Sequence, residues 1–277
     1  MTRVMFLGDT HGDLDFADRA LDEAWTSNCD AIFQVGDFGF LWPRSGDKFL
    51  RELDDLVRLR EIPLFWIDGN HDWHPEIRKR YPAKEYHVLT GSELSPQGVH
   101  HVRRGSQVHV QGPGDVLDNY ESRIRIVGLG GAPSIDYKMR REGVNWWPEE
   151  LITDEDANQV PLDIFGNHSR IDILATHDAP AAPPGFGPIR DETFNHRVAG
   201  NRAQIEKTIK LLNPRLLVHG HYHSRYTKCY DPDEFGPKNL GRKLTVEGLD
   251  CNSGKFPDTY LIVNADSEGN MSWRVTS

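Results

Sequence analysis

Seven side chains of the kinds that bind divalent metals lie in five short turns spread along this chain of 277 residues. Most of these turns contain glycine, and most directly follow an apolar run that is typical of a β-strand. Ligands of open α/β sheets bind outside the carboxyl ends of the strands, so the turns are expected to meet at one edge. The turns are Gly8–Gly12, Gly36–Gly39, Gly69–Asp72, Thr176–Asp178 and His219–His223.

The residue types in these turns favour metal chemistry. Carboxylate, imidazole and amide groups form the mixed oxygen and nitrogen donor set that suits divalent metals. Two such ions about 3.5–4 Å apart can clamp a phosphoryl group during hydrolysis. Taken singly, Asp9, Asp37 and Asn70 are more typical of helix caps and turns, which Asp and Asn both favour. Because histidines accompany them in five separate turns, we favour a centre of two metal ions.

The elements that must position these turns follow from the pattern of apolar residues. The first third of the chain alternates apolar runs with amphipathic stretches, which is the pattern of a parallel sheet covered by helices. The remainder indicates a second, more antiparallel half, and its proline-rich segment at 179–188 predicts a loop near the site. We expect strands at 4–7, 31–35, 63–67, 108–110, 123–127, 171–175, 215–218, 244–246, 259–263 and 271–275, and helices at 14–25, 48–59, 149–159 and 198–212.

Composition limits the class of partner. Hydrophobic residues make up 38% of the chain and charged residues 27%, which is typical of a soluble globular protein. The formal net charge of −10 argues against an extended surface for double-stranded nucleic acid, which needs a basic stripe. It leaves room for a small phosphorylated substrate, since bound cations would supply local positive charge.

Cysteine usage and hydropathy bear on location. The three cysteines, Cys29, Cys229 and Cys251, fit neither a zinc knuckle nor a disulfide framework. No apolar run approaches the length of a membrane span, and the run at 4–7 is too short for the core of a signal peptide. We therefore expect a cytoplasmic protein with no membrane partner.

The order of the motifs resembles a known family. Asp-x-His, Gly-Asp, Gly-Asn-His-Asp, His and Gly-His-x-His follow one another as in the calcineurin-like binuclear metallophosphoesterases, over Asp9 to His221. The resemblance implies an α/β fold, a four-layer αββα sandwich of two mixed sheets flanked by helices. It also implies one domain, 1–277, with a lid-like insertion around 134–170, and hydrolysis of phosphoester bonds by a metal-bridging hydroxide.

The resemblance assigns metal ligands residue by residue. The matching residues are Asp9, His11 and His221 for one ion, Asn70, His177 and His219 for the second, and Asp37 as the bridging carboxylate. Manganese is our first choice for both ions. Iron, zinc, nickel and magnesium are alternatives, because mixed nitrogen and oxygen sites do not discriminate sharply between metals.

The last motif leaves a choice of register. His219, His221 and His223 occupy alternate positions, which share one face if the strand continues. The metal-binding pair is therefore either His219 with His221, or His221 with His223. We favour the first pair, because the family's histidines sit as His-Gly-His directly after the strand.

Other residues are expected to act on the substrate. His71 matches the family's histidine that contacts the phosphate and protonates the leaving oxygen, and Asp72 would orient it. The lid-like region resembles a stretch found in a bacterial and phage branch of the superfamily. Within it Arg140 or Arg141 would reach a phosphate as a bidentate donor. His196, which follows the proline-rich loop, would line the substrate pocket. Exposed positions are the ordinary interpretation of all three.

The sequence leaves the substrate open. We favour a small nucleotide-type phosphodiester or phosphomonoester, with a nuclease acting on single strands or ends as the alternative. A protein phosphatase is disfavoured, because the Asp-Arg pair of that branch is missing after Asp37 and Asp72 stands where that branch has glutamate. A metal-free scaffold is also disfavoured, because all seven ligand positions hold competent residue types.

Overall fold

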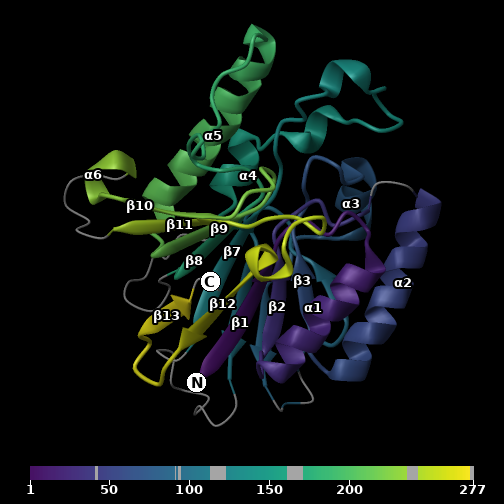
Figure 1. The fold of residues 1–277 in the computed structure, drawn as a ribbon, viewed down its shortest axis with the longest axis vertical. Helices are drawn as coiled ribbons and strands as arrows, with labels where there is room; N and C mark the ends of the chain where they lie inside the picture. The colour runs from purple at the N-terminus through teal and green to yellow at the C-terminus, as the bar shows by residue number, and fades with distance from the viewer. Residues whose placement is uncertain are drawn as a thin grey trace.

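The computed structural model describes residues 1–40, 43–90, 92, 95–112, 123–160, 171–235 and 243–274. It shows the predicted α/β fold, in which two mixed β-sheets pack face to face and helices cover their outer sides (Figure 1). No helix within these ranges is both long enough and apolar enough to cross a bilayer. Part of the predicted lid-like region, 161–170, and residue 275 of the last predicted strand lie outside the described residues.

The first sheet has six strands in the order β13-β12-β1-β2-β3-β5. Its strands β1, β2, β3 and β5 are parallel to one another. At the other edge β12 is antiparallel to β1, and β13 is antiparallel to β12. The helices α1 (Leu14–Thr26) and α2 (Pro43–Arg60) pack on its outer face. The strands are β1 (Thr2–Leu7), β2 (Ala31–Gln34), β3 (Leu64–Trp66), β5 (Val99–His101), β12 (Tyr260–Ala265) and β13 (Met271–Arg274).

The second sheet has seven strands in the order β10-β11-β9-β8-β7-β6-β4. The long helix α5 (Glu192–Leu212) packs on its outer face through Ile205 and Ile209. The strands are β4 (Tyr86–Leu89), β6 (Gln107–Gln111), β7 (Ile124–Leu129), β8 (Ile173–Thr176), β9 (Leu216–His219), β10 (Tyr226–Tyr230) and β11 (Leu244–Gly248). The short helices are α3 (His74–Arg80), α4 (Asp154–Asn158) and α6 (Pro232–Phe235).

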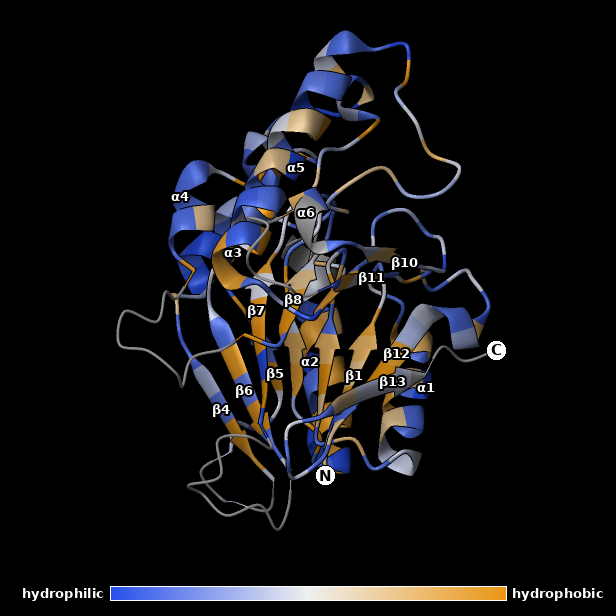
Figure 2. Ribbon diagram, turned by 90° about the vertical axis from the view of Figure 1, so that its left-hand side faces the viewer, coloured by the Kyte–Doolittle hydropathy of each residue, from blue (hydrophilic) through white to orange (hydrophobic). Residues whose placement is uncertain are grey.

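The main core lies between the two sheets. It is built from inward-facing apolar residues of both, among them Phe6, Phe33 and Phe65 from the first sheet and Ile126 and Val218 from the second. Figure 2 shows the central strands as mostly hydrophobic, whereas α4 and α5 carry many hydrophilic residues. Burial on both faces explains why these strands read as continuous apolar runs.

Strand register brings the motif turns together. Leu7 pairs with Gln34, and Gln34 pairs with Trp66, so three parallel strands end at the same level of the first sheet. In the second sheet β8 and β9 are also parallel and deliver the last two motifs. The turns from both sheets therefore meet at the carboxyl edge, as the strand-end argument predicts.

Several element boundaries differ from the sequence prediction. The predicted helix at 149–159 is a 3₁₀ turn (Pro148–Glu150) followed by α4, because Thr153 and Asp156 form a capping box that starts a new helix. Helix α5 begins six residues before the predicted 198, where the Asp191 side chain accepts a hydrogen bond from the Phe194 N–H.

A buried ion pair fastens the first sheet to the segment after β7. Asp68, which follows β3, accepts hydrogen bonds from Nε and Nη2 of Arg104 at 2.9 and 2.6 Å. The same guanidinium donates to the carbonyl oxygens of Leu151 and Glu149. Although burial opposes it, Arg104 holds the pKa of Asp68 well below its usual range. His74 and His101 contact the same carboxylate.

Replacing Arg104 with methionine should lower the free energy of unfolding by about 3–5 kcal/mol, because Asp68 would stay buried without its main counter-charge. Chemical denaturation measures this. Arg58→Met is the matched control, since Arg58 also pairs with an aspartate, Asp54, at 2.6 Å but on an exposed face of α2. That variant should be nearly as stable as the wild type. Equal losses in the two variants would contradict this role of Arg104.

Candidate metal centre

Asp9 follows β1 and is fully buried. Its two carboxylate oxygens accept hydrogen bonds from the backbone N–H of His221, at 3.2 and 3.1 Å. Its Oδ2 also lies 3.2 Å from Nε2 of His223. One ligand atom each from Asp9, His11 and His223 lie within 4.8 Å of one another, which is close enough for a single ion to contact all three.

Asp37, in the turn after β2, lies between two sets of histidines. Its Oδ1 is 3.3 Å from Nε2 of His177, and its Oδ2 is 3.6 Å from Nε2 of His11. The backbone N–H of His71 donates to Oδ1 at 2.8 Å and fixes the carboxylate. Asp9, Asp37 and His177 form a second group of ligand atoms within 4.8 Å. A carboxylate whose two oxygens face different groups has the geometry of a bridge.

The side chain of His177, which follows β8 of the second sheet, reaches the first sheet. Its Nδ1 lies 2.8 Å from the carbonyl oxygen of Val35, and this contact is a hydrogen bond when Nδ1 carries the proton. That tautomer leaves Nε2 free to bind a metal, and Nε2 is also 3.2 Å from Oδ1 of Asn70. The Asn70 amide donates to the Ser134 hydroxyl, which in turn donates to Glu150 at 2.6 Å. This chain of contacts aims the amide oxygen of Asn70 at the centre.

The last motif bends sharply out of β9. His219, still in the strand, has Nδ1 2.8 Å from the carbonyl oxygen of Gly220 and Nε2 2.6 Å from the hydroxyl of Tyr226. Both of its ring nitrogens therefore have protein partners. His221 and His223 adopt left-handed backbone conformations, with φ of 68° and 47°. The ring of His221 lies 5.1 Å from that of His177, so the structure brings His221 and His223 to the centre.

Two glycines let these turns approach closely. A Cβ on Gly220 would lie 2.0 Å from Oδ1 of Asp9, and one on Gly36 would lie 2.3 Å from Nδ1 of His177. Both distances are below van der Waals contact. The glycines in these turns are therefore explained by the close packing of backbone against the ligand side chains.

The buried carboxylates change the protonation of the histidines. Burial by itself lowers the pKa of His177, but Asp37 and Asp9 outweigh it and raise that pKa to about 10. The same balance raises the pKa of His11 to about 9. Burial also opposes ionisation of Asp37, yet His177 and then His71 hold its pKa well below its usual range. The centre therefore attracts positive charge.

The donor set fits divalent ions. Among the described residues, the ion-pair contacts of Asp9 and Asp37 are all with histidines. Buried carboxylates without a lysine or arginine partner need another source of positive charge, and two cations would provide it. Carboxylate, imidazole and amide ligands suit manganese, iron or zinc alike.

The residues expected to act on the substrate are placed differently from one another. Nη2 of Arg140 lies 3.0 and 3.1 Å from the two ring nitrogens of His71, and its Nε donates to Asp136 at 2.7 Å. His71 is partly exposed, with its Nε2 3.9 Å from Oδ2 of Asp37. Arg141 and His196 are both exposed. The structure thus brings Arg140 to the metal centre beside His71.

Asp72 supports the turn that carries Asp37. Its buried carboxylate accepts backbone N–H donors from Phe38, Gly39 and Phe40, at 2.9 to 3.1 Å, and from Gly69 at 2.8 Å. These contacts tie the second motif to the third. Asp72 thereby fixes the backbone around the bridging carboxylate.

Several supporting residues lie outside the five metal-binding turns. The Asn252 side chain lies 2.9 Å from Nδ1 of His11, and Tyr226 contacts His219. Ser134 and Glu150 form the second layer behind Asn70. Ser134 and Glu150 lie in the stretch that resembles the bacterial and phage branch, whereas Asn252 and Tyr226 had no sequence signal.

The sequence model of one family matches most of the chain. The model for calcineurin-like phosphoesterases matches residues 2–225. The chain belongs to this family. Membership makes it a metal-dependent phosphoesterase and implies two metal ions at the centre described above. No curated protein matches it in sequence.

Two solved structures of low sequence identity are similar to this one. A dimetal phosphatase from Danio rerio matches with a TM-score of 0.50 and 11% identity, over 95% of this chain and 92% of that one. The protein TT1561 of Thermus thermophilus matches with a TM-score of 0.48 and 15% identity, over 99% and 98% of the two chains. At 11% identity the likeness to the dimetal phosphatase concerns the fold alone.

Replacing Asp72 with asparagine should lower the free energy of unfolding of the metal-free phosphoesterase by about 1–3 kcal/mol, because an amide cannot accept all four buried N–H donors. Metal affinity should fall as well, since the Asp37 turn loosens. Denaturation and metal titration measure the two effects. Asp266→Asn is the matched control, because Asp266 accepts two backbone N–H donors in an exposed hairpin turn. Equal behaviour of the two variants would show that Asp72 does not support the centre.

Proposed function

We propose that this protein hydrolyses phosphoester bonds in a small phosphorylated substrate of nucleotide type. It would use two divalent ions, and manganese is our first choice for both. The observation that carries the proposal is the position of Asp37, whose Oδ1 lies 3.3 Å from Nε2 of His177 and whose Oδ2 lies 3.6 Å from Nε2 of His11. The net charge of −10 favours a small substrate over an extended duplex. A cytoplasmic location is part of the proposal and is supported by three cysteines free of disulfides.

We propose that His221 and His223, rather than His219 and His221, are the metal-binding pair of the last motif. One ion would be held by Asp9, His11 and His223, whose ligand atoms already lie within 4.8 Å of one another. Support comes also from His219, whose nitrogens are engaged by Tyr226 and the Gly220 carbonyl. The second ion would then be held by Asn70, His177 and His221, with Asp37 as the bridge.

The residues of the chain divide the remaining tasks. When bound, the two ions would lower the pKa of a water molecule and offset the charge of the phosphate. Arg140 would donate to a phosphate oxygen from its place beside His71. His71, at the exposed side of Asp37, would hold the substrate phosphate and give a proton to the leaving oxygen. Asp136 keeps the Arg140 guanidinium oriented through its own hydrogen bond.

The register is tested by two histidine variants. His223→Ala should reduce the bound metal from two ions towards one, and should weaken metal binding by more than the roughly 10–100-fold typical of supporting residues. His219→Gln should keep both ions, because His219 contacts Tyr226. Metal content of the folded proteins, measured by plasma emission, separates the two. Loss of metal in His219→Gln, with metal retained in His223→Ala, would instead show that His219 and His221 are the metal-binding pair.

The reaction is tested with chelator-stripped protein. Added Mn²⁺ should restore hydrolysis of p-nitrophenyl phosphate or bis-p-nitrophenyl phosphate, and the preferred compound tells monoester from diester chemistry. Asp37→Asn should reduce turnover by about 100-fold or more and weaken binding of both ions, because the bridge loses its charge. Its fold, followed by circular dichroism, should remain. Wild-type turnover in Asp37→Asn would contradict the two-metal assignment.

A further inference from the structure

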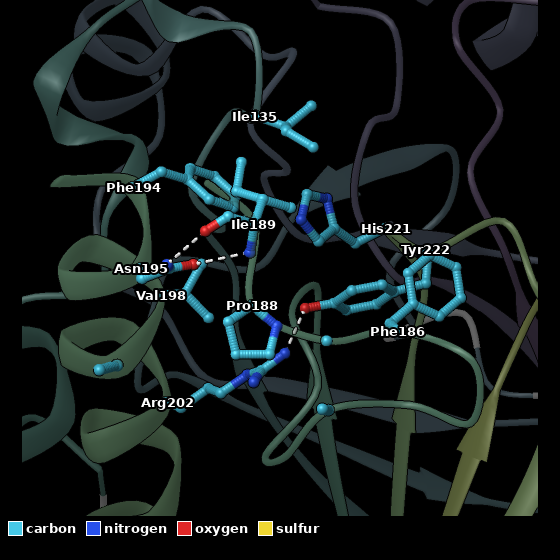
Figure 3. A pocket seen from close by; sticks show the side chains of 13 residues that line it. Ile135, Phe186, Pro188, Ile189, Phe194, Asn195, Val198, Arg202, His221 and Tyr222 are labelled. Atoms are coloured by element: carbon cyan, nitrogen blue, oxygen red, sulfur yellow. Dashed lines mark hydrogen bonds between the residues drawn. The ribbon is translucent and has the colours of Figure 1, made fainter. Parts of the chain in front are cut away.

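A cavity of about 460 Å³ opens beside the metal centre (Figure 3). It lies between the first half of α5 and the end of the proline-rich loop, 179–188. His221 belongs to its wall and is also a proposed metal ligand. One molecule could therefore place its phosphate at the metal centre and another of its groups in the cavity. The volume falls within the range of small-molecule sites.

The wall of the cavity is largely apolar and rich in rings. Phe194 and Val198 come from α5, and Phe186 and Pro188 come from the loop. Phe186 packs edge-on against Tyr222, with ring centres 5.0 Å apart, yet remains 45% exposed. Exposed apolar side chains gathered around a cavity are typical of a binding surface.

Much of the polar wall is already engaged within the protein. The Asn195 side chain accepts from the backbone N–H of Ile189 and donates to its carbonyl oxygen, at 3.2 and 2.8 Å, as Figure 3 shows. The Tyr222 hydroxyl donates to Asp178 at 2.9 Å and accepts from Arg202 at 2.7 Å. A site that reads the polar edge of a ligand needs free donors and acceptors. This wall would instead contact a ligand through the faces of its rings and through its shape.

We propose that this cavity binds the aromatic ring of the phosphoester substrate, whether an aryl group or a nucleobase, by contact with the ring faces and without reading the ring edges. The inference rests on the proposed function, since that function places the phosphorus at the metal centre. A ring fits better than an alkyl chain because Phe186, Phe194 and Tyr222 gain from aromatic contacts beyond the area they bury.

Binding of non-hydrolysable probes tests the cavity without any turnover. Manganese-loaded protein should bind phenylphosphonate about tenfold more tightly than methylphosphonate in calorimetry. Ala199→Trp, which fills the cavity from α5, should remove that preference. Leu211→Trp is the matched control, because it lies on the same helix about 18 Å further along and should keep the preference. Phe186→Ala, at an exposed loop position, should weaken phenylphosphonate binding even if Ala199→Trp fails to fold.

Hydrolysis distinguishes the two sources of the ring. For wild-type protein kcat/KM should be higher for phenyl phosphate than for methyl phosphate, and Ala199→Trp should reduce this ratio. If nucleotides are the source of the ring, adenosine and cytidine monophosphates should have KM values within about threefold of each other, since edge groups are not read. A large difference between the two bases would overturn recognition by faces alone.

Failure of this inference is separable from failure of the proposed function. Equal affinity for the two phosphonates, or a phenyl preference that survives Ala199→Trp, would overturn the cavity inference even in an active enzyme. A phenyl preference that Ala199→Trp removes supports the cavity inference. That support would stand even if no phosphate ester were hydrolysed, whereas the proposed function would then be wrong.

Discussion

Two buried carboxylates, Asp9 and Asp37, set the constraint on which the rest of the structure depends. Burial of an ionised carboxylate costs several kcal/mol unless other groups compensate its charge. In this fold backbone N–H groups and histidines provide part of that compensation. His177 reaches Asp37 from the opposite sheet, so the compensation also fixes how the two sheets face each other. If one sheet shifted along the other, His177 and Asp37 would separate. The burial of both carboxylates would then lose the compensation that His177 provides.

The turns that carry the centre hold backbone strain. His11, Asp37, His221 and His223 all have φ between 47° and 68°, a left-handed conformation that costs non-glycine residues free energy. Such strain persists only where the surroundings over-determine the backbone. The Asp72 carboxylate does this for the Asp37 turn, and Asp9 does it for His221 through the backbone N–H. The same carboxylates that need positive charge therefore also hold the strained turns in place.

The sequence predicted the strand ends well because they combine two independent signals, an apolar run buried on both faces and a turn of Asp, Asn or Gly. Where only one of these signals was present, the sequence left the assignment open or missed the element. Alternation made His219, His221 and His223 equivalent, and only the bend after Gly220 and the contact with Tyr226 separate them. The edge strands β4, β5 and β10 were missed because they are short and partly exposed, which weakens the apolar pattern.

In the proposed function, substrate choice depends on segments outside the metal-binding motifs. The motifs would interact with the phosphate, which all phosphate esters share. They therefore cannot discriminate between the organic groups of different esters. Arg140 comes from the segment after β7, and the cavity is built by α5 and the proline-rich loop. These segments meet the centre at three residues, His71, Asn70 and His221. A change at Arg140 or in the cavity wall can therefore alter which substrate is held while leaving Asp9 and Asp37 in place, because Arg140 contacts His71 and the cavity wall includes His221 rather than the buried carboxylates.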